Sequence, residues 1–147
     1  MRVLCLDLGE RRIGVACGDA RVGIATPLTT IQRRSWRQDS AAVRRLLTEQ
    51  QADTLVVGLP VSLDGALHYQ GERIKKEGER LGKSLGMPVV FCDERFSTVI
   101  AEERLQASPT GARRKAPLDA AAAAVILETY FAAQREVGCS SRRAERE

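Results

Sequence analysis

The arrangement of the apolar runs places the strongest constraint on the fold. Three short runs, at residues 3–6, 13–18 and 22–28, are separated only by short polar turns, which is typical of strands joined as hairpins. Two later runs, at 54–59 and 89–92, are separated instead by segments whose apolar residues recur at helical spacing. Strands joined through helices run parallel. We therefore expect an α/β fold with a mixed five-stranded sheet, a three-stranded meander followed by parallel strands, and helices packed against it.

The apolar spacing also predicts the helices and the extent of the domain. It indicates helices over residues 40–50, 71–85, 100–106 and 118–137, with a polar loop at 108–117. A chain of 147 residues is the size of one domain, and we find neither an internal repeat nor a linker. We expect residues 1–137 to form a single domain and residues 138–147 to be a polar, mobile C-terminal tail.

Composition excludes several classes of protein and of site. No apolar run is long enough to span a membrane, and Asp7 interrupts the first run before it could serve as a signal peptide. The four cysteines include no C-x-x-C pair, which favours a reducing, cytoplasmic setting. Since His68 is the only histidine, zinc sites with paired histidines are excluded, and a Ser-His-Asp triad would have to use His68.

Three acidic residues stand where ligands gather in such a sheet, outside the carboxyl ends of its parallel strands. Asp7 ends the first predicted strand and Glu94 follows the last. Each alone could be a turn residue, but two at one edge favour a metal site. Asp119 opens the final helix before a run of alanines that allows close packing on the sheet. Spacing alone slightly favours Asp119 as a helix N-cap.

Carboxylates without histidine or thiolate ligands form a site of hard oxygen donors. Such a site suits Mg²⁺ or Mn²⁺. Two such ions can activate water and stabilise the leaving oxygen of a phosphodiester. The acids therefore raise the hypothesis of a metal-dependent phosphodiesterase that uses two ions.

The basic residues are arranged around the same positions. The net charge is only +4, so its distribution matters more than its size. Basic runs usually form solvated loops. Yet three of the four clusters border the predicted acids, where they could contact a phosphate backbone. The clusters are Arg11–Arg12, Arg33–Arg34 with Arg37, Arg95, and Arg113–Lys115.

Four blocks of the sequence resemble the YqgF (RuvX) family. The first contains Asp7-Leu8-Gly9 and Arg12-Ile13-Gly14-Val15-Ala16, and the second contains Val57-Gly58-Leu59-Pro60 with Asp64-Gly65. The third, Asp93-Glu94-Arg95-Phe96-Ser97-Thr98, is similar to the family's specific D-E-R-[LF]-S-T signature. The fourth starts at Asp119-Ala120 and ends at Tyr130-Phe131. The blocks follow the family's order and spacing from Met1 to Phe131.

This resemblance implies an RNase H-like nuclease that depends on metal. The family's acids fall on Asp7, Glu94 and Asp119, which would hold the ions and be catalytic. The implied substrates are the precursor of 16S ribosomal RNA, matured at its 5′ end, and the four-way Holliday junction of DNA recombination. The partners would be these nucleic acids and ribosomal particles, bound by a monomer or a homodimer. The predicted substrate contacts are Gly9, Arg11, Arg12, Arg95, Ser97, Thr98, Arg114 and Lys115.

Two other functions compete with this interpretation. Asp7-Leu8-Gly9 with Gly14 also resembles the phosphate-binding hairpin of sugar kinases and actin-like ATPases. Those proteins enclose a nucleotide between two such domains, whereas 147 residues supply one. A non-catalytic nucleic-acid-binding or ribosome-assembly factor is the other alternative. It would have little reason to keep all three acids.

Overall fold

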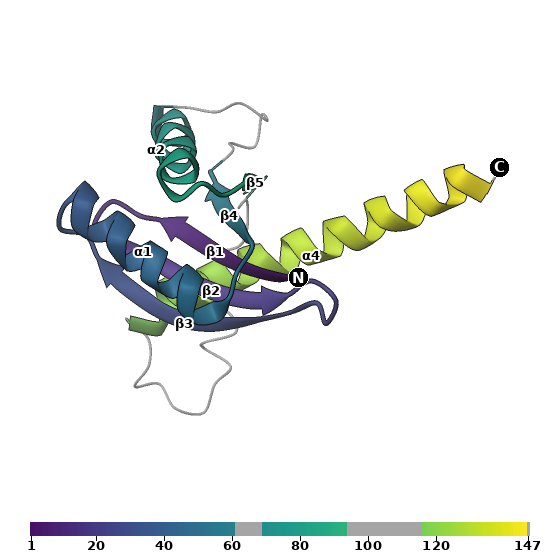
Figure 1. Cartoon of the computed structure of the whole chain (residues 1–147), viewed down its shortest axis with the longest axis horizontal. Helices are drawn as coiled ribbons and strands as arrows, with labels where there is room; N and C mark the ends of the chain where they lie inside the picture. The colour runs from purple at the N-terminus through teal and green to yellow at the C-terminus, as the bar shows by residue number, and fades with distance from the viewer. Residues whose placement is uncertain (61–68, 94–115, 147) are drawn as a thin grey trace.

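The computed structural model describes residues 1–60, 69–93 and 116–146 of the chain, and in the last segment it describes side chains over 119–134. It contains the five predicted strands (Figure 1). They are β1 (Arg2–Leu8), β2 (Arg12–Asp19), β3 (Ile24–Gln32), β4 (Thr54–Leu59) and β5 (Val89–Asp93). The helices are α1 (Trp36–Gln50), α2 (Tyr69–Leu85) and α4 (Ala116–Arg146).

The strands form the mixed five-stranded sheet expected from the sequence, in the order β3-β2-β1-β4-β5. The meander β1-β2-β3 is antiparallel, while β4 and β5 pair in parallel with β1 and β4 respectively. In the register of β1 and β2, Asp7 lies opposite Gly14 and Arg2 lies opposite Asp19. We call these two ends of the sheet the Asp7 end and the Asp19 end.

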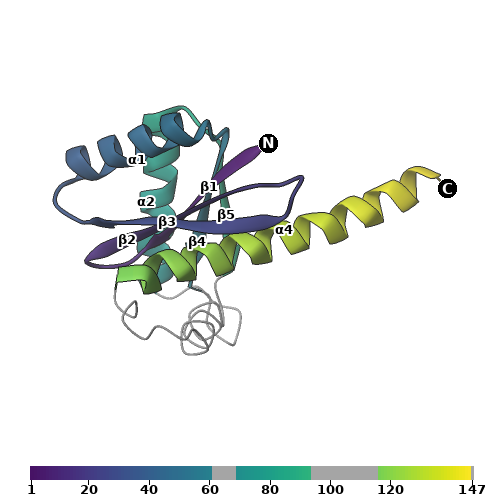
Figure 2. The ribbon, with the colours of Figure 1, turned by 90° about the horizontal axis from the view of Figure 1, so that it is seen from below.

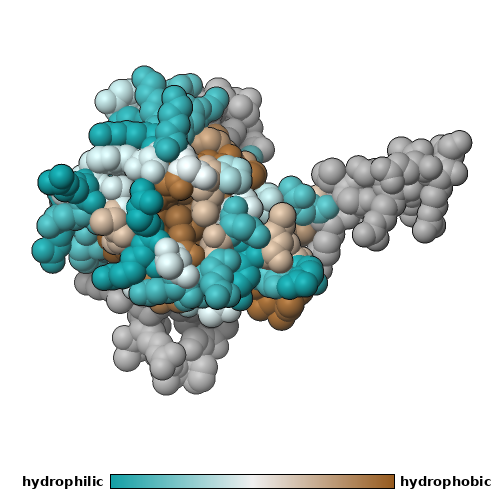
Figure 3. Space-filling model, in the orientation of Figure 1, coloured by the Kyte–Doolittle hydropathy of each residue, from teal (hydrophilic) through white to brown (hydrophobic). Residues whose placement is uncertain are grey.

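The helices form a layer on each face of the sheet. Figure 2 shows α1 and α2 on one face and α4 running along the other. On the α1/α2 face, hydrophilic residues cover most of the surface, and apolar residues reach it near the centre (Figure 3). Among the described residues, no helix is long and apolar enough to cross a membrane.

Alternation along β1 divides the core between the two faces. Leu4, Leu6 and Leu8 pack in the cluster beneath α1 and α2, whereas Val3 and Cys5 pack in the cluster beneath α4. Successive side chains of a strand point to opposite faces of the sheet. Asp7 therefore belongs to the face that α4 covers.

Helix α1 begins four residues before the predicted start at residue 40. Ser35 has extended backbone angles, and its hydroxyl accepts a hydrogen bond from the backbone N–H of Gln38 at 3.2 Å. The backbone N–H of Arg34 donates to the Asp39 carboxylate at 3.1 Å. Ser35 is thus the N-cap, and the first turn is stabilised by capping rather than by the apolar spacing on which the prediction rested.

Two other boundaries also differ from the prediction. Strand β3 continues to Gln32 and includes Pro27, which is tolerated because β3 is an edge strand and needs no second partner. Helix α4 begins at Ala116 and continues to Arg146, so the tail predicted from residue 138 is part of a helix. A glycine such as Gly138 weakens a helix by only about 1 kcal/mol and need not end it. The helix predicted at 100–106 lies outside the described residues.

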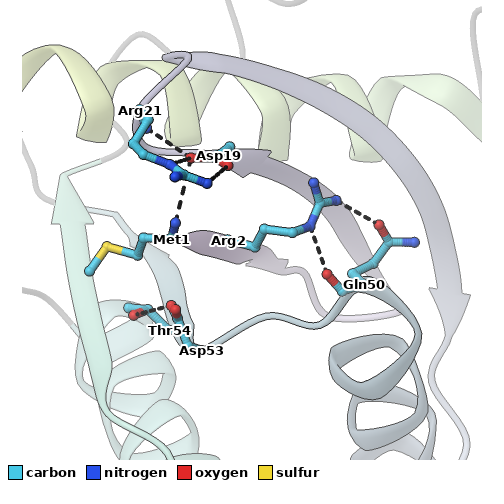
Figure 4. Close-up of polar contacts among 7 residues, drawn as sticks. All are labelled: Met1, Arg2, Asp19, Arg21, Gln50, Asp53 and Thr54. Carbon is cyan, nitrogen blue, oxygen red and sulfur yellow. Dashed lines mark hydrogen bonds and ion pairs between the residues drawn. The ribbon is translucent and has the colours of Figure 1, made fainter.

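The Asp19 end is held together by polar contacts (Figure 4). The Asp19 carboxylate accepts hydrogen bonds from the backbone and side chain of Arg21, and the N-terminal amine lies 3.6 Å from it. Arg2 reaches across to the end of α1, where its guanidinium donates to the backbone carbonyl of Gln50 at 2.7 Å and to its side chain at 3.0 Å. At this end, the Asp19 carboxylate and the Arg2 guanidinium therefore both have hydrogen-bond partners within the chain.

Candidate functional site

Asp7 is the penultimate residue of β1 and is half-buried on the α4 face. Its immediate neighbours Leu6 and Leu8 are buried on the opposite face, so the strand is anchored on both sides of the carboxylate. Across the sheet, Asp7 pairs with Gly14, which has no side chain to cover it. Gly14 of β2 therefore leaves space beside the Asp7 carboxylate on the α4 face of the sheet.

That space is filled by the first turn of α4. A Cβ atom built on Gly14 would overlap the carbonyl oxygen of Asp119 and would lie 3.1 Å from the backbone nitrogen of Ala120. Gly14 thus allows the helix backbone to rest directly on β2. Behind it, Ala123 and Ala124 are buried in the cluster beneath α4, as the alanine run predicted. This close packing brings Asp119 to the Asp7 end.

The structure corrects the N-cap interpretation of Asp119. Since α4 begins at Ala116, Asp119 is in the first helical turn, not at the position before it. A carboxylate in the first turn is favoured by the helix dipole.

The two carboxylates are close enough to influence each other. Burial and, to a smaller extent, the negative charge of Asp119 together raise the pKa of Asp7 to about 6. Oδ2 of Asp119 is buried and accepts no hydrogen bond. Arg12 Nε lies 3.3 Å from this oxygen, which makes an ion pair without hydrogen-bond geometry. Over the described ranges, the two carboxylates thus share a single ion pair, the one between Asp119 and the exposed Arg12. One positive charge does not balance two negative charges.

These features fit a hard divalent cation. The available ligand atoms are carboxylate oxygens, which such cations prefer. One of them, Oδ2 of Asp119, is buried and accepts no hydrogen bond. Within residues 1–60, 69–93 and 119–134, no three acidic, histidine or cysteine side chains lie together as a metal cluster. The third predicted acid, Glu94, lies outside the described residues, directly after the end of β5 at Asp93.

The loop between β1 and β2 presents the basic residues beside the acids. Its shape depends on Gly9, whose N–H donates to the carbonyl oxygens of Asp7 and Arg12 at 3.1 and 3.0 Å. A Cβ at Gly9 would lie only 2.7 Å from the Arg12 carbonyl oxygen. Arg11 and Arg12 are exposed at the surface of this loop. The predicted contacts Gly9, Arg11 and Arg12 are therefore brought together near Asp7.

Arg33 is bonded to this loop through its side chain and its backbone. The sequence analysis did not single it out as a site residue. Its Nε donates to the carbonyl oxygen of Gly9 at 2.6 Å, and its backbone N–H donates to that of Arg11 at 2.9 Å. Its two terminal nitrogens bind the Glu77 carboxylate on α2 at 2.8 and 2.7 Å. The sequence signals Arg33 only as one of a basic cluster, because its partners are far away along the chain.

The other predicted substrate contacts cannot be placed. Arg95, Ser97, Thr98, Arg114 and Lys115 all lie outside the described residues, as does His68. Their roles stay predictions.

The chain matches known proteins over most of its length. The family model of RuvX, described as Holliday junction resolvase, matches residues 1–133. A "Putative pre-16S rRNA nuclease" of Caldanaerobacter subterraneus is 40% identical over 137 residues, which cover 92% of this chain and 99% of the relative. A protein of the same name from Synechococcus elongatus is 44% identical, covering 90% of each chain.

Two solved structures share its fold. RuvC of Thermus thermophilus, solved in complex with a Holliday junction substrate, superposes with a TM-score of 0.59 at 15% identity, covering 92% of this chain and 96% of RuvC. The Holliday junction resolvase of fowlpox virus gives 0.56 at 11% identity, covering 90% and 99%. These likenesses confirm the RNase H-like architecture predicted from the sequence. We conclude that this chain belongs to the RuvX family of nucleases.

Proposed function

We propose that this chain is a metal-dependent endonuclease that hydrolyses phosphodiesters in structured nucleic acid. The observation that carries the proposal is the carboxylate pair of Asp7 and Asp119, which a buried helix contact holds together while one of its oxygens lacks a hydrogen-bond donor. A structural role alone gives no reason to keep two carboxylates so close that the charge of Asp119 makes the ionisation of Asp7 less favourable.

Asp7, Asp119 and Glu94 are the proposed ligands of two Mg²⁺ or Mn²⁺ ions. In β5 the even-numbered residues Val90 and Cys92 pack beneath α4, on the same face as Asp7. Glu94 follows β5 directly in the sequence and enters the proposal as the third acid of the family pattern. When bound, the ions supply positive charge that activates water and stabilises the leaving oxygen of the phosphodiester.

The basic residues have the complementary role of holding the substrate backbone. Arg11 and Arg12 extend from the loop that follows Asp7, and Arg12 already pairs with Asp119. In the proposed complex, Arg12 turns from the carboxylate to a substrate phosphate. Arg95, Ser97, Thr98, Arg114 and Lys115 complete the proposed set of phosphate contacts, with the backbone of Gly9.

We favour the precursor of 16S ribosomal RNA as the substrate, cleaved in its 5′-end maturation, because the curated relatives carry that name at 40–44% identity. Holliday junction resolution is the second candidate, since the family's description gives it. The setting would be the cytoplasm, and ribosomal particles would be partners of the first activity. Cleavage of a junction on both sides would require a homodimer, whereas cleavage of RNA can use a monomer.

The decisive experiment offers the purified chain a precursor rRNA fragment and a four-way DNA junction, each with Mg²⁺, Mn²⁺ or a chelator. We expect metal-dependent cleavage of the RNA. We expect Asp7→Asn to lower cleavage at least about a hundredfold, the scale of losing one electrostatic stabiliser of a transition state.

Asp19→Asn is the matched control, because it removes the same charge from the same type of position at the other end of the sheet. It should cleave like the wild type. Full activity of Asp7→Asn would refute the mechanism. Tight ATP binding without affinity for either nucleic acid would favour the actin-like alternative, and metal-independent binding without any cleavage would favour a non-catalytic assembly factor.

A further inference from the structure

A pocket with both polar and apolar lining lies at the Asp7 end of the sheet, on the face opposite α4. It has a volume of about 270 Å³ and is lined by residues from the start of α1 and the middle of α2. Arg33 lines this pocket and also binds the carbonyl oxygen of Gly9, so the pocket and the carboxylates flank the same loop. The lining residues used below are Arg33, Arg34, Trp36, Asp39, Glu77 and Arg80.

An aromatic ring and a cation are stacked in this pocket. The guanidinium carbon of Arg80 on α2 lies 3.8 Å from the ring centroid of Trp36 on α1. Trp36 is half-buried and is the chain's single tryptophan, in a sequence with only 4% aromatic residues. Bases of single-stranded nucleic acid stack on both aromatic rings and arginine planes. The pair therefore offers a flat surface of the kind that binds an unpaired base.

The charges of the pocket leave two arginines available. Arg33 is neutralised by Glu77, and the Asp39 carboxylate accepts the backbone N–H of Arg34 in the cap of α1. Within the part of the chain that the structure describes, the exposed guanidinium groups of Arg34 and Arg80 have no carboxylate partner. Unpaired arginines at a pocket beside a carboxylate site favour an anionic ligand.

The exposed cations continue around the end of the sheet. Arg11 and Arg12 lie on the loop beside Asp7, and the Arg11 carbonyl accepts the backbone N–H of Arg33. Arg34 follows directly and faces the pocket. A phosphate backbone that passes Asp119 could thus contact Arg12, Arg11 and Arg34 in succession.

We propose that this pocket is a second nucleic-acid contact site, in which Arg34 and Arg80 bind phosphates and Trp36 stacks with a base of the substrate strand that flanks the cleaved bond. The proposal rests on the proposed nuclease function and identifies where the single strand beside the cleavage point is held. A free nucleotide is disfavoured because the cations extend along a path instead of enclosing one phosphate group.

Trp36 provides a direct measurement, since its emission reports on this pocket alone. A short single-stranded RNA is titrated into the Asp7→Asn protein, which binds without cleaving, and we expect the emission to change as the RNA binds. The double variant R34Q/R80Q in the same background should bind about tenfold more weakly, the scale of losing two ionic contacts with phosphates. Its slope of log affinity against log salt should fall by about 0.7 for each lost phosphate contact.

Matched variants separate binding from folding. Arg21→Gln removes an exposed arginine at the Asp19 end and should leave the RNA affinity unchanged. With labelled RNA, Trp36→Phe should keep most of the affinity and Trp36→Ala should lose about as much as the arginine variant. In the cleaving protein, R34Q/R80Q should raise KM and leave kcat unchanged.

Three results would overturn the proposal: unchanged affinity and salt slope in R34Q/R80Q, an emission that does not respond to RNA, or a response to AMP or UMP that RNA does not compete away. A failure of the proposed function is distinguishable from these. If the wild type cleaves neither RNA nor DNA while Trp36 still reports RNA binding that depends on Arg34 and Arg80, the nuclease assignment fails and the contact site stands.

Discussion

The two ends of the sheet treat the same residue type in opposite ways. Asp19 ends β2 and Asp7 lies next to the end of β1, but their pKa values move in opposite directions. Hydrogen bonds from Arg21 lower the pKa of Asp19 to about 2, whereas burial and the charge of Asp119 raise that of Asp7 to about 6. Figure 4 shows the partners that surround Asp19.

The difference separates a carboxylate that stabilises the fold, Asp19, from the carboxylate that we propose binds a cation, Asp7. Asp19 is ionised with its partners already present, so the folded chain needs nothing more at that end. Asp7 is ionised at neutral pH only at a free-energy penalty, which an added cation would remove. Perturbed pKa values mark functional sites for this reason. Each of the following predictions compares one change at the Asp7 end with its counterpart at the Asp19 end.

The largest effect is expected from the pH dependence of Asp7. The pKa of Asp7 is about 6 in the folded state, above its ordinary value of 3.8. Between pH 3.8 and 6 the folded state therefore binds more protons than the unfolded state, and stability falls as pH rises through this window. Above pH 6 the penalty is about 3 kcal/mol in the metal-free protein. Asp7→Asn should therefore stabilise the chelated protein at pH 7.5 by up to that amount and lose its advantage below pH 4. Chemical unfolding across pH measures this, and an equal pH profile for both proteins would contradict it.

Two glycines of β2 allow a matched test of packing. Gly14→Ala would force Asp119 and α4 away from the sheet, and Gly18→Ala would press on the Ile24 carbonyl and the Phe131 ring. Both should destabilise by about 1–3 kcal/mol, the usual range for overpacking. Only Gly14→Ala should also lose cleavage, because it changes the separation of the carboxylates. Thermal unfolding and cleavage rates are measured together. Equal activity in the two variants would show that this separation is unimportant.

Arg33 links α2 to the loop between β1 and β2, and Arg2 links the end of α1 to β1. These two arginines should differ in the same way. Arg33→Ala leaves Glu77 half-buried without its partner and frees the loop at Gly9, and Arg2→Ala removes the contact with Gln50. Each should cost about 1–2 kcal/mol of stability. Arg33→Ala should in addition reduce cleavage about tenfold, the scale of misplacing groups by a fraction of an ångström. Arg33→Lys should recover stability better than activity, since lysine cannot bind Glu77 and Gly9 together.

The smallest effect is expected at Asp19. Its folded pKa of about 2 lies below 3.8, so its contribution to stability is complete above pH 4 and is lost as pH falls towards 2. Because the pair with Arg21 is exposed, the contribution is small and decreases with salt. Asp19→Asn should unfold like the wild type at pH 2 and slightly more easily at pH 7. A large loss at neutral pH would mean that the Asp19 end is more strongly coupled to the fold than its exposure indicates.

The sequence predicted what depends on local pattern. The three-stranded meander and the parallel direction of the later strands followed from short turns and intervening helices, and Thr54–Leu59 was predicted with its observed boundaries. Asp7 was singled out because an acid at the end of an apolar strand is unusual. The alanine run after Asp119 indicated that α4 packs closely on the sheet, and the buried Ala123 and Ala124 confirm this packing. Each of these signals, the short turns, the acid at a strand end and the alanine run, consists of residues that are close together in the sequence.

The sequence did not predict what depends on distant partners. The role of Arg33 comes from Glu77 and Gly9, which lie 44 and 24 positions away. Asp119 was interpreted as a cap because the start of α4 at Ala116 gives no strong capping signal. The function of Gly14 emerges only when the helix that rests on it is in place.

The contact of α4 with Gly14 also determines when the protein can become active during its synthesis. Asp7 is synthesised 112 residues before Asp119. No partial chain that lacks α4 can bring the two acids together, however well its meander has formed. A nascent chain whose α4 has not yet been made would therefore lack the carboxylate pair on which the proposed cleavage depends.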